Sequence, residues 1–118
     1  MHLLPTITAP WENIEGFSSL HSTTTRLADG LGEAHAHMVR IEAGGIIDRH
    51  EAGFGQLWIV VEGKGWVAGG DDRRVEVSSG DVAFVERGES HAKGSDHGMA
   101  AVMIQIYDLQ PMLGMDTD

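Results

Sequence analysis

Three polar residues flank apolar runs of the chain, and all three are of types that bind ligands. His50 precedes the flexible stretch "EAGFG", Gln56 follows it, and His91 ends the stretch "GDVAFVERGESH". Imidazole nitrogens bind divalent Zn, Fe, Ni, Cu and Mn, whereas a glutamine offers a metal only a neutral carbonyl oxygen. A bend at "EAGFG" would bring His50 and Gln56 into one cavity. The residue types are therefore compatible with a metal site or with a pocket for an organic molecule.

The elements that must position these side chains are short β-strands. Between residues 44 and 107, β-branched or aromatic runs alternate with turns, as in "GQLWIVVEGKGWVAGGDDRRVEVSSGD". Glycine supplies positive φ in such turns and aspartate tolerates it. No segment carries a helix signal. Consecutive hairpins of this kind predict an all-β fold, an antiparallel sandwich or barrel.

The overall composition excludes several classes of function. The chain has 118 residues, a length typical of one domain, and a formal net charge of −10, which disfavours nucleic acid and anionic membranes as partners. It has no cysteine, and its longest apolar run, "LWIVV", is far shorter than the ~20 residues of a membrane span. We therefore expect a soluble cytoplasmic protein.

Two stretches of the sequence resemble the paired motifs of the cupin family. In the first, a glycine, His50, Gln56 and Gly63 follow the order of the cupin Gly–His–Glu–Gly pattern. The second is "GDVAFVERGESH", which is similar to the cupin pattern of Gly-Asp, an apolar strand, Pro-x-Gly and a histidine, with Glu86 in place of the proline and Gly88 matching the glycine. The resemblance covers about residues 41–107. It implies a double-stranded β-helix, which is a small jelly-roll barrel.

The resemblance also implies a metal site at the barrel mouth. Cupins typically hold a divalent ion there on three histidines and one glutamate. Carried over, His50 and His91 match two of the histidines and Gln56 matches the glutamate, whereas Ala52 stands where the third histidine belongs. The implied ion is Zn, Mn, Ni or Fe, with Gln56 as a weak ligand. Without a carboxylate the ion would keep its full charge in a pocket of low dielectric constant, which is costly.

A histidine from another strand could replace the ligand missing at Ala52. In "EAHAHMVRIEAG", residues two apart share a face of an extended strand, so His35 and His37 lie on the same side as Val39 and Ile41. Since Val39 and Ile41 are apolar, this side is expected to face the interior. We predict His37, or else His35, as the further ligand. The alternative is that both histidines cap the rim and bond to backbone or water.

Trp58 shares a strand face with Gln56, and we expect it either to line the ligand pocket or to belong to the core.

Two functions follow from the resemblance. One is a metal-dependent enzyme of the dioxygenase, isomerase or lyase type acting on a small polar organic molecule. The alternative is a metal-free cupin that binds or senses a small molecule without catalysis.

The predicted organisation is a single domain over residues 1–118. Its barrel is expected at about 34–107, and the terminal segments 1–32 and 108–118 are expected to pack on a partner subunit. Apolar stretches in both termini, "LLPTITAPW" and "PMLGM", favour a homodimer that uses them. Glu86 and Glu89 in "ERGES" are expected to be solvated.

Overall fold

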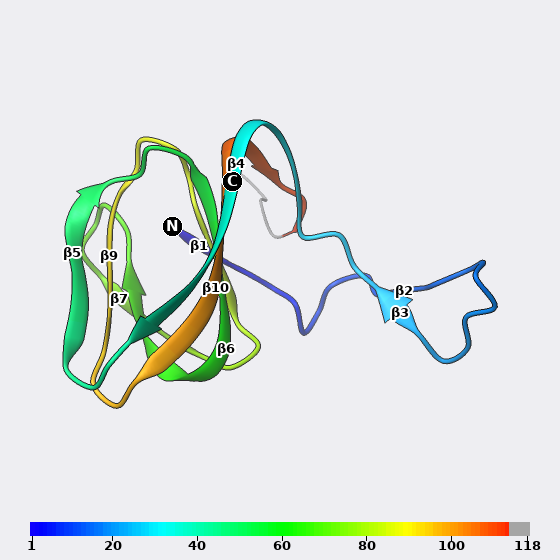
Figure 1. The fold of residues 1–118 in the computed structure, drawn as a ribbon, viewed down its shortest axis with the longest axis horizontal. Coiled ribbons are helices and arrows are strands. Elements are labelled where there is room, and N and C mark those ends of the chain that lie inside the picture. The colour runs from blue at the N-terminus through cyan, green and yellow to red at the C-terminus, as the bar shows by residue number, and fades with distance from the viewer. Residues whose placement is uncertain (114–118) are drawn as a thin grey trace.

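The computed structural model describes residues 1–113 and contains only strands and connecting loops over that range (Figure 1). The strands are β1 (His2–Leu4), β2 (Glu12–Asn13), β3 (Thr23–Thr24), β4 (Ala28–Ile41), β5 (Gly45–Glu51), β6 (Gly55–Ala68), β7 (Arg74–Ser78), β8 (Val82–Val85), β9 (Ser90–Ser95) and β10 (Met99–Pro111). The predicted all-β fold is confirmed.

Eight of these strands form a jelly-roll barrel from two sheets that share β6. One sheet has the order β1-β8-β6-β10-β4, and the other has the order β5-β9-β6-β7. Neighbouring strands in both sheets are antiparallel. The first half of β6 therefore belongs to one wall of the barrel and its second half to the other.

The corner of β6 lies at Gly63. Up to this residue β6 pairs with β10, and from Lys64 onward it pairs with β7. Gly63 has a φ of 75°, and a Cβ atom at this position would lie 2.2 Å from the carbonyl oxygen of Gly98. Only glycine combines a positive φ with such a close backbone approach, which explains the glycine that ends the apolar run.

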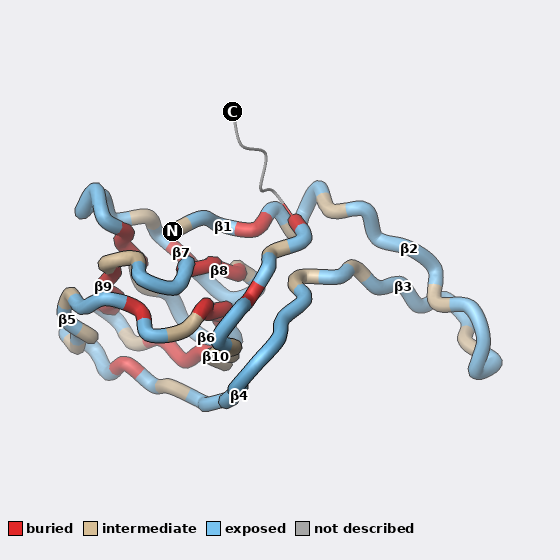
Figure 2. Tube along the Cα trace, turned by 90° about the horizontal axis from the view of Figure 1, so that it is seen from above, coloured by how far each residue is buried: buried red, intermediate tan, exposed pale blue. Residues whose placement is uncertain are grey.

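The core fills the space between the two sheets. Its inner cluster includes Trp58, Ala101 and Ile41 from one sheet and Val67 and Val77 from the other. A second cluster, on the outer side of the larger sheet, packs Leu4, Leu57, Val82, Phe84, Leu109 and Leu113 together. Figure 2 shows that burial is concentrated in the barrel strands, whereas the chain before β4 is mostly exposed.

The terminal segments have two different roles. β1 pairs with β8 and so extends the larger sheet, whereas β2 and β3 form a separate two-stranded hairpin that projects from the barrel (Figure 1). Strands β4 and β10 begin and end at Ala28 and Pro111, so pairing continues beyond the predicted bounds of about 34–107. Packing of these segments on a partner subunit stays a prediction.

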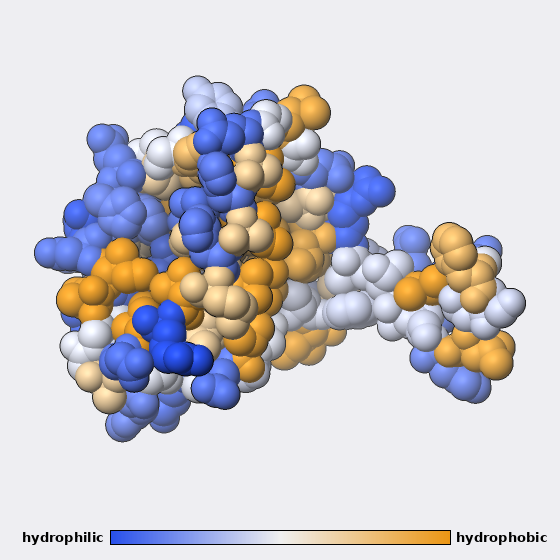
Figure 3. Space-filling model, viewed as in Figure 1, coloured by the Kyte–Doolittle hydropathy of each residue, from blue (hydrophilic) through white to orange (hydrophobic). Residues whose placement is uncertain are grey.

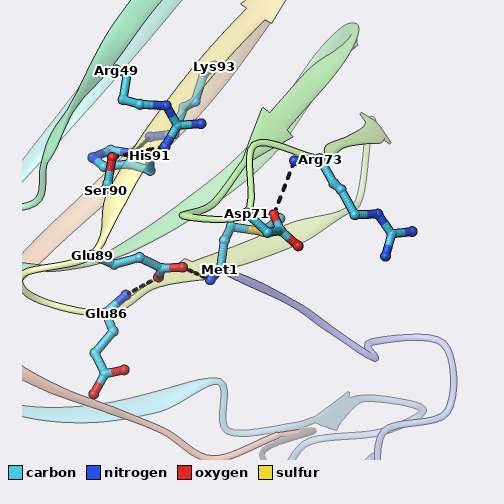
Figure 4. Close-up of polar contacts among 9 residues, drawn as sticks. All are labelled: Met1, Arg49, Asp71, Arg73, Glu86, Glu89, Ser90, His91 and Lys93. Carbon is cyan, nitrogen blue, oxygen red and sulfur yellow. Dashed lines mark hydrogen bonds and ion pairs between the residues drawn. The ribbon is translucent and has the colours of Figure 1, made fainter.

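Glu89 is not solvated as expected. Its carboxylate pairs with the amino group of Met1 and accepts a hydrogen bond from the backbone N–H of Glu86 at 3.1 Å. Figure 4 shows Glu89 between these two partners. The contact joins the loop before β9 to the first residue of the chain, 88 positions away in sequence, which a sequence pattern does not reveal.

Candidate functional site

The two histidines predicted from separate motifs lie side by side. His50 of β5 is opposite His91 of β9 in the antiparallel ladder, and their ring centroids are 4.4 Å apart. A bulge between Ile47 and His50 adds a residue to β5, so His50 shares the inner side with Ile47 of the core. The two imidazoles therefore lie on the same face of the β5–β9 ladder, and their role in a common site stays a prediction.

The two imidazoles differ in their surroundings. His91 is 1% exposed, whereas His50 remains exposed and its Nδ1 lies 2.8 Å from the backbone oxygen of Asp48. His50 is therefore open to solvent, whereas His91 is enclosed by the barrel.

Lys93 is the member of the site that sequence reasoning missed. It follows His91 by two residues in β9, and only 2% of it is exposed. Its Nζ lies 2.9 Å from Nδ1 of His91 and 4.9 Å from the ring centroid of Trp58. Figure 4 shows both side chains rising from the same strand. The sequence could have predicted this position, because residues two apart in a strand share a face, so an inward His91 requires an inward Lys93.

Burial changes the acid–base behaviour of this pair. Desolvation lowers the pKa of Lys93 to about 7, because the interior disfavours the ammonium form. The pKa of His91 falls to about 3, mainly through burial and further through the neighbouring positive charge of Lys93. None of the ion pairs among residues 1–113 joins Lys93 to a carboxylate. His91 is therefore a neutral imidazole at pH 7.

Three buried polar atoms of the inward-facing residues have no hydrogen-bond partner within residues 1–113. They are Oε1 of Gln56, Nε1 of Trp58 and Nε2 of His91. An ammonium group can only donate, so a charged Lys93 makes Nδ1 of His91 the acceptor and leaves the imidazole hydrogen on Nε2. Trp58 and His91 then present N–H donors, and Gln56 presents an amide. Such groups are costly to bury unpaired, so they are candidate contacts for a ligand.

Gln56 and Trp58 lie on the same face of one strand, β6, as the alternation predicts. Both lie on the inner face of β6, where Gln56 is opposite Gln105 and Trp58 is opposite Met103 of β10. Trp58 is fully buried in the inner core cluster and is thus part of the core as well as a wall of the site. Its role as a contact for a ligand stays a prediction.

His35 and His37 lie on the inner face of β4, as the alternation predicts. Val39 of the same face packs on the inner core, and His37 is opposite Met103. Both histidines are nevertheless exposed, and Nε2 of His35 lies 2.6 Å from a carboxylate oxygen of Glu33. These positions of β4 are therefore open to solvent. His35 is thus held at the rim.

The described residues do not fit a divalent metal as they are arranged. No group of three or more His, Cys, Asp or Glu side chains in residues 1–113 is placed to hold an ion. Nδ1 of His91 is engaged by Lys93, whose ammonium would repel a cation, and Ala52 is a buried apolar residue. The assignment of His50, Gln56, His91 and His37 as metal ligands stays a prediction for the metal-loaded protein.

The family comparison agrees with the fold. A sequence model of a family described as Cupin matches residues 20–116, which is most of the chain. The comparison with curated proteins gives no match. Within residues 1–113, no helix has the length and apolar character needed to cross a membrane.

Several solved structures share the architecture. A cupin-like protein from Thermotoga maritima aligns with a TM-score of 0.60 and 19% identity over 70% of this chain and 67% of its own. A cupin superfamily protein from Desulfitobacterium hafniense aligns with a TM-score of 0.59 and 16% identity over 85% of this chain and 100% of its own. A predicted oxalate decarboxylase from Thermotoga maritima aligns with a TM-score of 0.56 and 20% identity over 61% of this chain and 64% of its own. This chain thus spans about two thirds of that protein, and at these identities the likeness shows the fold alone.

Proposed function

The chain belongs to the cupin family, and we propose that it binds a small organic anion, such as a carboxylate, inside the barrel without a metal. The observation that carries this proposal is the buried Lys93, with its amine 2.9 Å from His91. In this protein a lysine supplies positive charge in the interior, next to a histidine that the cupin resemblance assigns to a metal.

Electrostatics favour an anionic ligand at this position. A buried ammonium without a carboxylate partner is costly, and an anion that enters the barrel offsets this cost. Arg49 lies nearby and contributes to lowering the pKa of His91, while its own guanidinium bonds to Ser90 and Asp72. Coulomb attraction inside the barrel is stronger than in water because the effective dielectric constant is lower.

The unpaired hydrogen-bonding groups match the same ligand class. A carboxylate accepts hydrogen bonds only, and the N–H groups of Trp58 and His91 would donate to it. The amide of Gln56 adds a group that can donate through its nitrogen or accept from a ligand hydroxyl. The exposed inner-facing His35, His37 and His50 give the ligand an entrance.

The metal-dependent function remains the competing proposal, supported by the pairing of His50 and His91. In that case the two imidazoles would hold the ion, with Gln56 as a weak ligand and His37 moving in from β4. A bound metal would polarise a carbonyl or carboxylate of the substrate. Lys93 would then have to be neutral or turned away from His91.

Thermal-shift and calorimetric titrations of chelator-treated protein distinguish these proposals. Acetate, malonate and pyruvate serve as anionic probes, acetamide is the neutral control, and Zn, Mn, Ni and Fe(II) are added separately. A probe present at 100 times its Kd stabilises the fold by about 2.7 kcal/mol. We expect at least one carboxylate to raise the melting temperature without metal, and acetamide to have no effect.

Lys93→Met supplies the matched control, because it keeps the length of the side chain and removes the charge. Loss of carboxylate binding in this variant, with the fold retained by circular dichroism, supports the anion site. Stoichiometric metal binding that His91→Ala abolishes, together with carboxylate binding only after metal addition, would instead establish the metal-dependent function.

A further inference from the structure

We infer that a groove on the outer face of the smaller sheet, β5-β9-β6-β7, binds a small organic cation, such as a quaternary ammonium ion, on the indole ring of Trp66. The groove has a volume of about 300 Å³, and its lining includes Trp66, Glu76 and Asp96. Asp96 follows the last residue of β9, whereas His91 lies near the first. The groove is thus at the other end of β9, and the inference is independent of the function proposed for the barrel interior.

Trp66 is an outward-facing aromatic residue in the middle of this sheet. Val67 belongs to the inner core, so its neighbour Trp66 points to the outer face of β6. Trp66 is opposite Glu76 of β7 and Gly94 of β9. A Cβ atom on Gly94 would lie 2.5 Å from the indole, so the glycine lets the ring pack directly on the backbone of β9. The ring is half-buried there and still lines the groove.

A cation of the protein itself already rests on this ring. The guanidinium carbon of Arg74 lies over the indole of Trp66, 3.9 Å from the ring centroid. Arg74 is exposed and takes part in none of the ion pairs among residues 1–113. A cation–π contact at an exposed site is weak, so a cationic ligand can replace the guanidinium at little cost. Arg74 therefore marks the position that the ammonium group of the ligand would take.

The charges of the groove favour a cation. Glu76 and Asp96 both line it, and neither carboxylate belongs to an ion pair within residues 1–113. Lys64 also lines the groove, but the two carboxylates outnumber its ammonium group. The formal net charge of −10 on the whole chain further attracts cations from solution.

The same lining disfavours a metal ion and an anion. Calcium and magnesium need several oxygen ligands around one point, and no group of three or more His, Cys, Asp or Glu side chains in residues 1–113 is placed to hold an ion. An anion would meet the carboxylates of Glu76 and Asp96. An ammonium ion that carries methyl groups has an apolar surface for the indole and a charge for the carboxylates, so it matches both features.

Choline and its uncharged isostere 3,3-dimethylbutan-1-ol test the inference on the full-length protein. Saturation-transfer NMR from the protein to the methyl protons of each probe gives the affinities. Tryptophan fluorescence in a Trp11→Phe background then locates the site, because Trp58 is fully buried and Trp11 is the other exposed indole. We expect saturable binding of choline with a change in the emission of Trp66, and no saturable binding of 3,3-dimethylbutan-1-ol.

Arg74→Gln and Arg73→Gln form a matched pair, because each removes one positive charge but only Arg74 lies over Trp66. Arg74→Gln frees the ring, so it should bind choline about two- to five-fold more tightly than Arg73→Gln. Trp66→Leu should abolish binding with the fold retained by circular dichroism. Glu76→Gln, at an exposed position, should weaken binding and tests the groove even if Trp66→Leu does not fold.

Several results would overturn the inference. These are the absence of choline binding, equal binding of choline and its neutral isostere, equal affinities of the two arginine variants, and full affinity in Trp66→Leu or Glu76→Gln. The thermal-shift results with carboxylates have no bearing on this outcome, because they report on the barrel interior.

Discussion

Lys93 determines the charge of the barrel interior, so its removal should change stability as well as binding. The pKa of about 7 against 10.5 in water corresponds to a cost on the order of 5 kcal/mol, at about 1.4 kcal/mol per pKa unit. Lys93→Met removes this cost but leaves Nδ1 of His91 unpaired, which costs about 1–3 kcal/mol. We expect a net gain of about 2–4 kcal/mol, measured by urea unfolding of ligand-free protein at pH 6.

The pH dependence of this gain follows from the direction of the shift. Between pH 7 and 10.5 the unfolded chain holds a proton on Lys93 that the folded chain has released, so wild-type stability rises with pH. The advantage of Lys93→Met should therefore be largest below pH 7 and shrink toward pH 10.5. An advantage that is constant over this range would show that Lys93 is not desolvated.

We expect His91 to contribute to the acid side of the stability profile. Its pKa of about 3 lies below the ordinary value of 6.5, because burial and then Lys93 oppose protonation. The unfolded chain takes up this proton first, so stability should fall as pH drops from 6.5 toward 3. His91→Gln should flatten this limb in chelator-treated protein, as followed by urea midpoints. An unchanged slope in the variant would assign the acid limb to other groups.

At the scale of elements, the shared strand β6 depends on its corner at Gly63. A Cβ atom there would meet the carbonyl oxygen of Gly98, and φ is 75°. Gly63→Ala should therefore destabilise the protein by about 1–3 kcal/mol or more. Gly53→Ala is the matched control, because a Cβ at Gly53 meets no atom within 4 Å and its φ is not positive. Equal urea midpoints for the two variants would contradict this role of the corner.

At the scale of the whole molecule, the homodimer expected from the sequence remains a prediction. Exposed apolar side chains now indicate which surface the two copies would share. The outer face of the larger sheet aligns Met38, Val102 and Ile59 across three strands, and Met38 is 67% exposed. The projecting hairpin region exposes Phe17 almost fully, and Figure 3 shows apolar side chains at its end. Such surfaces are unusual in a monomer, so we propose that a second copy covers them.

Met38→Glu tests this assembly without disturbing the core. We expect sedimentation at high micromolar concentration to show a dimer for the wild type and a shift toward monomer for Met38→Glu. Ile46→Glu, at an exposed position on β5 of the other sheet, should leave the dimer intact. A wild type that sediments as a monomer would contradict the proposal, as would equal dissociation of both variants.

The sequence by itself determined the local features of this protein. Alternation of apolar and polar residues gave the strands, and turn residues gave their ends, because the two faces of a strand repeat every two residues. The two motifs then predicted that His50 and His91 would meet, and the structure places their rings 4.4 Å apart. The inward side of β4 was also predictable, since Val39 and Ile41 on that face are apolar.

Only the tertiary structure decided how these faces combine. The contact of Lys93 with Trp58 joins two strands across the barrel, and the bulge before His50 sets the register of β5 against β9. Such register shifts depend on pairing between distant segments, so no local pattern encodes them. The same holds for the burial of Lys93: its side of β9 follows from periodicity, but the loss of water that lowers its pKa exists only once both sheets close around it.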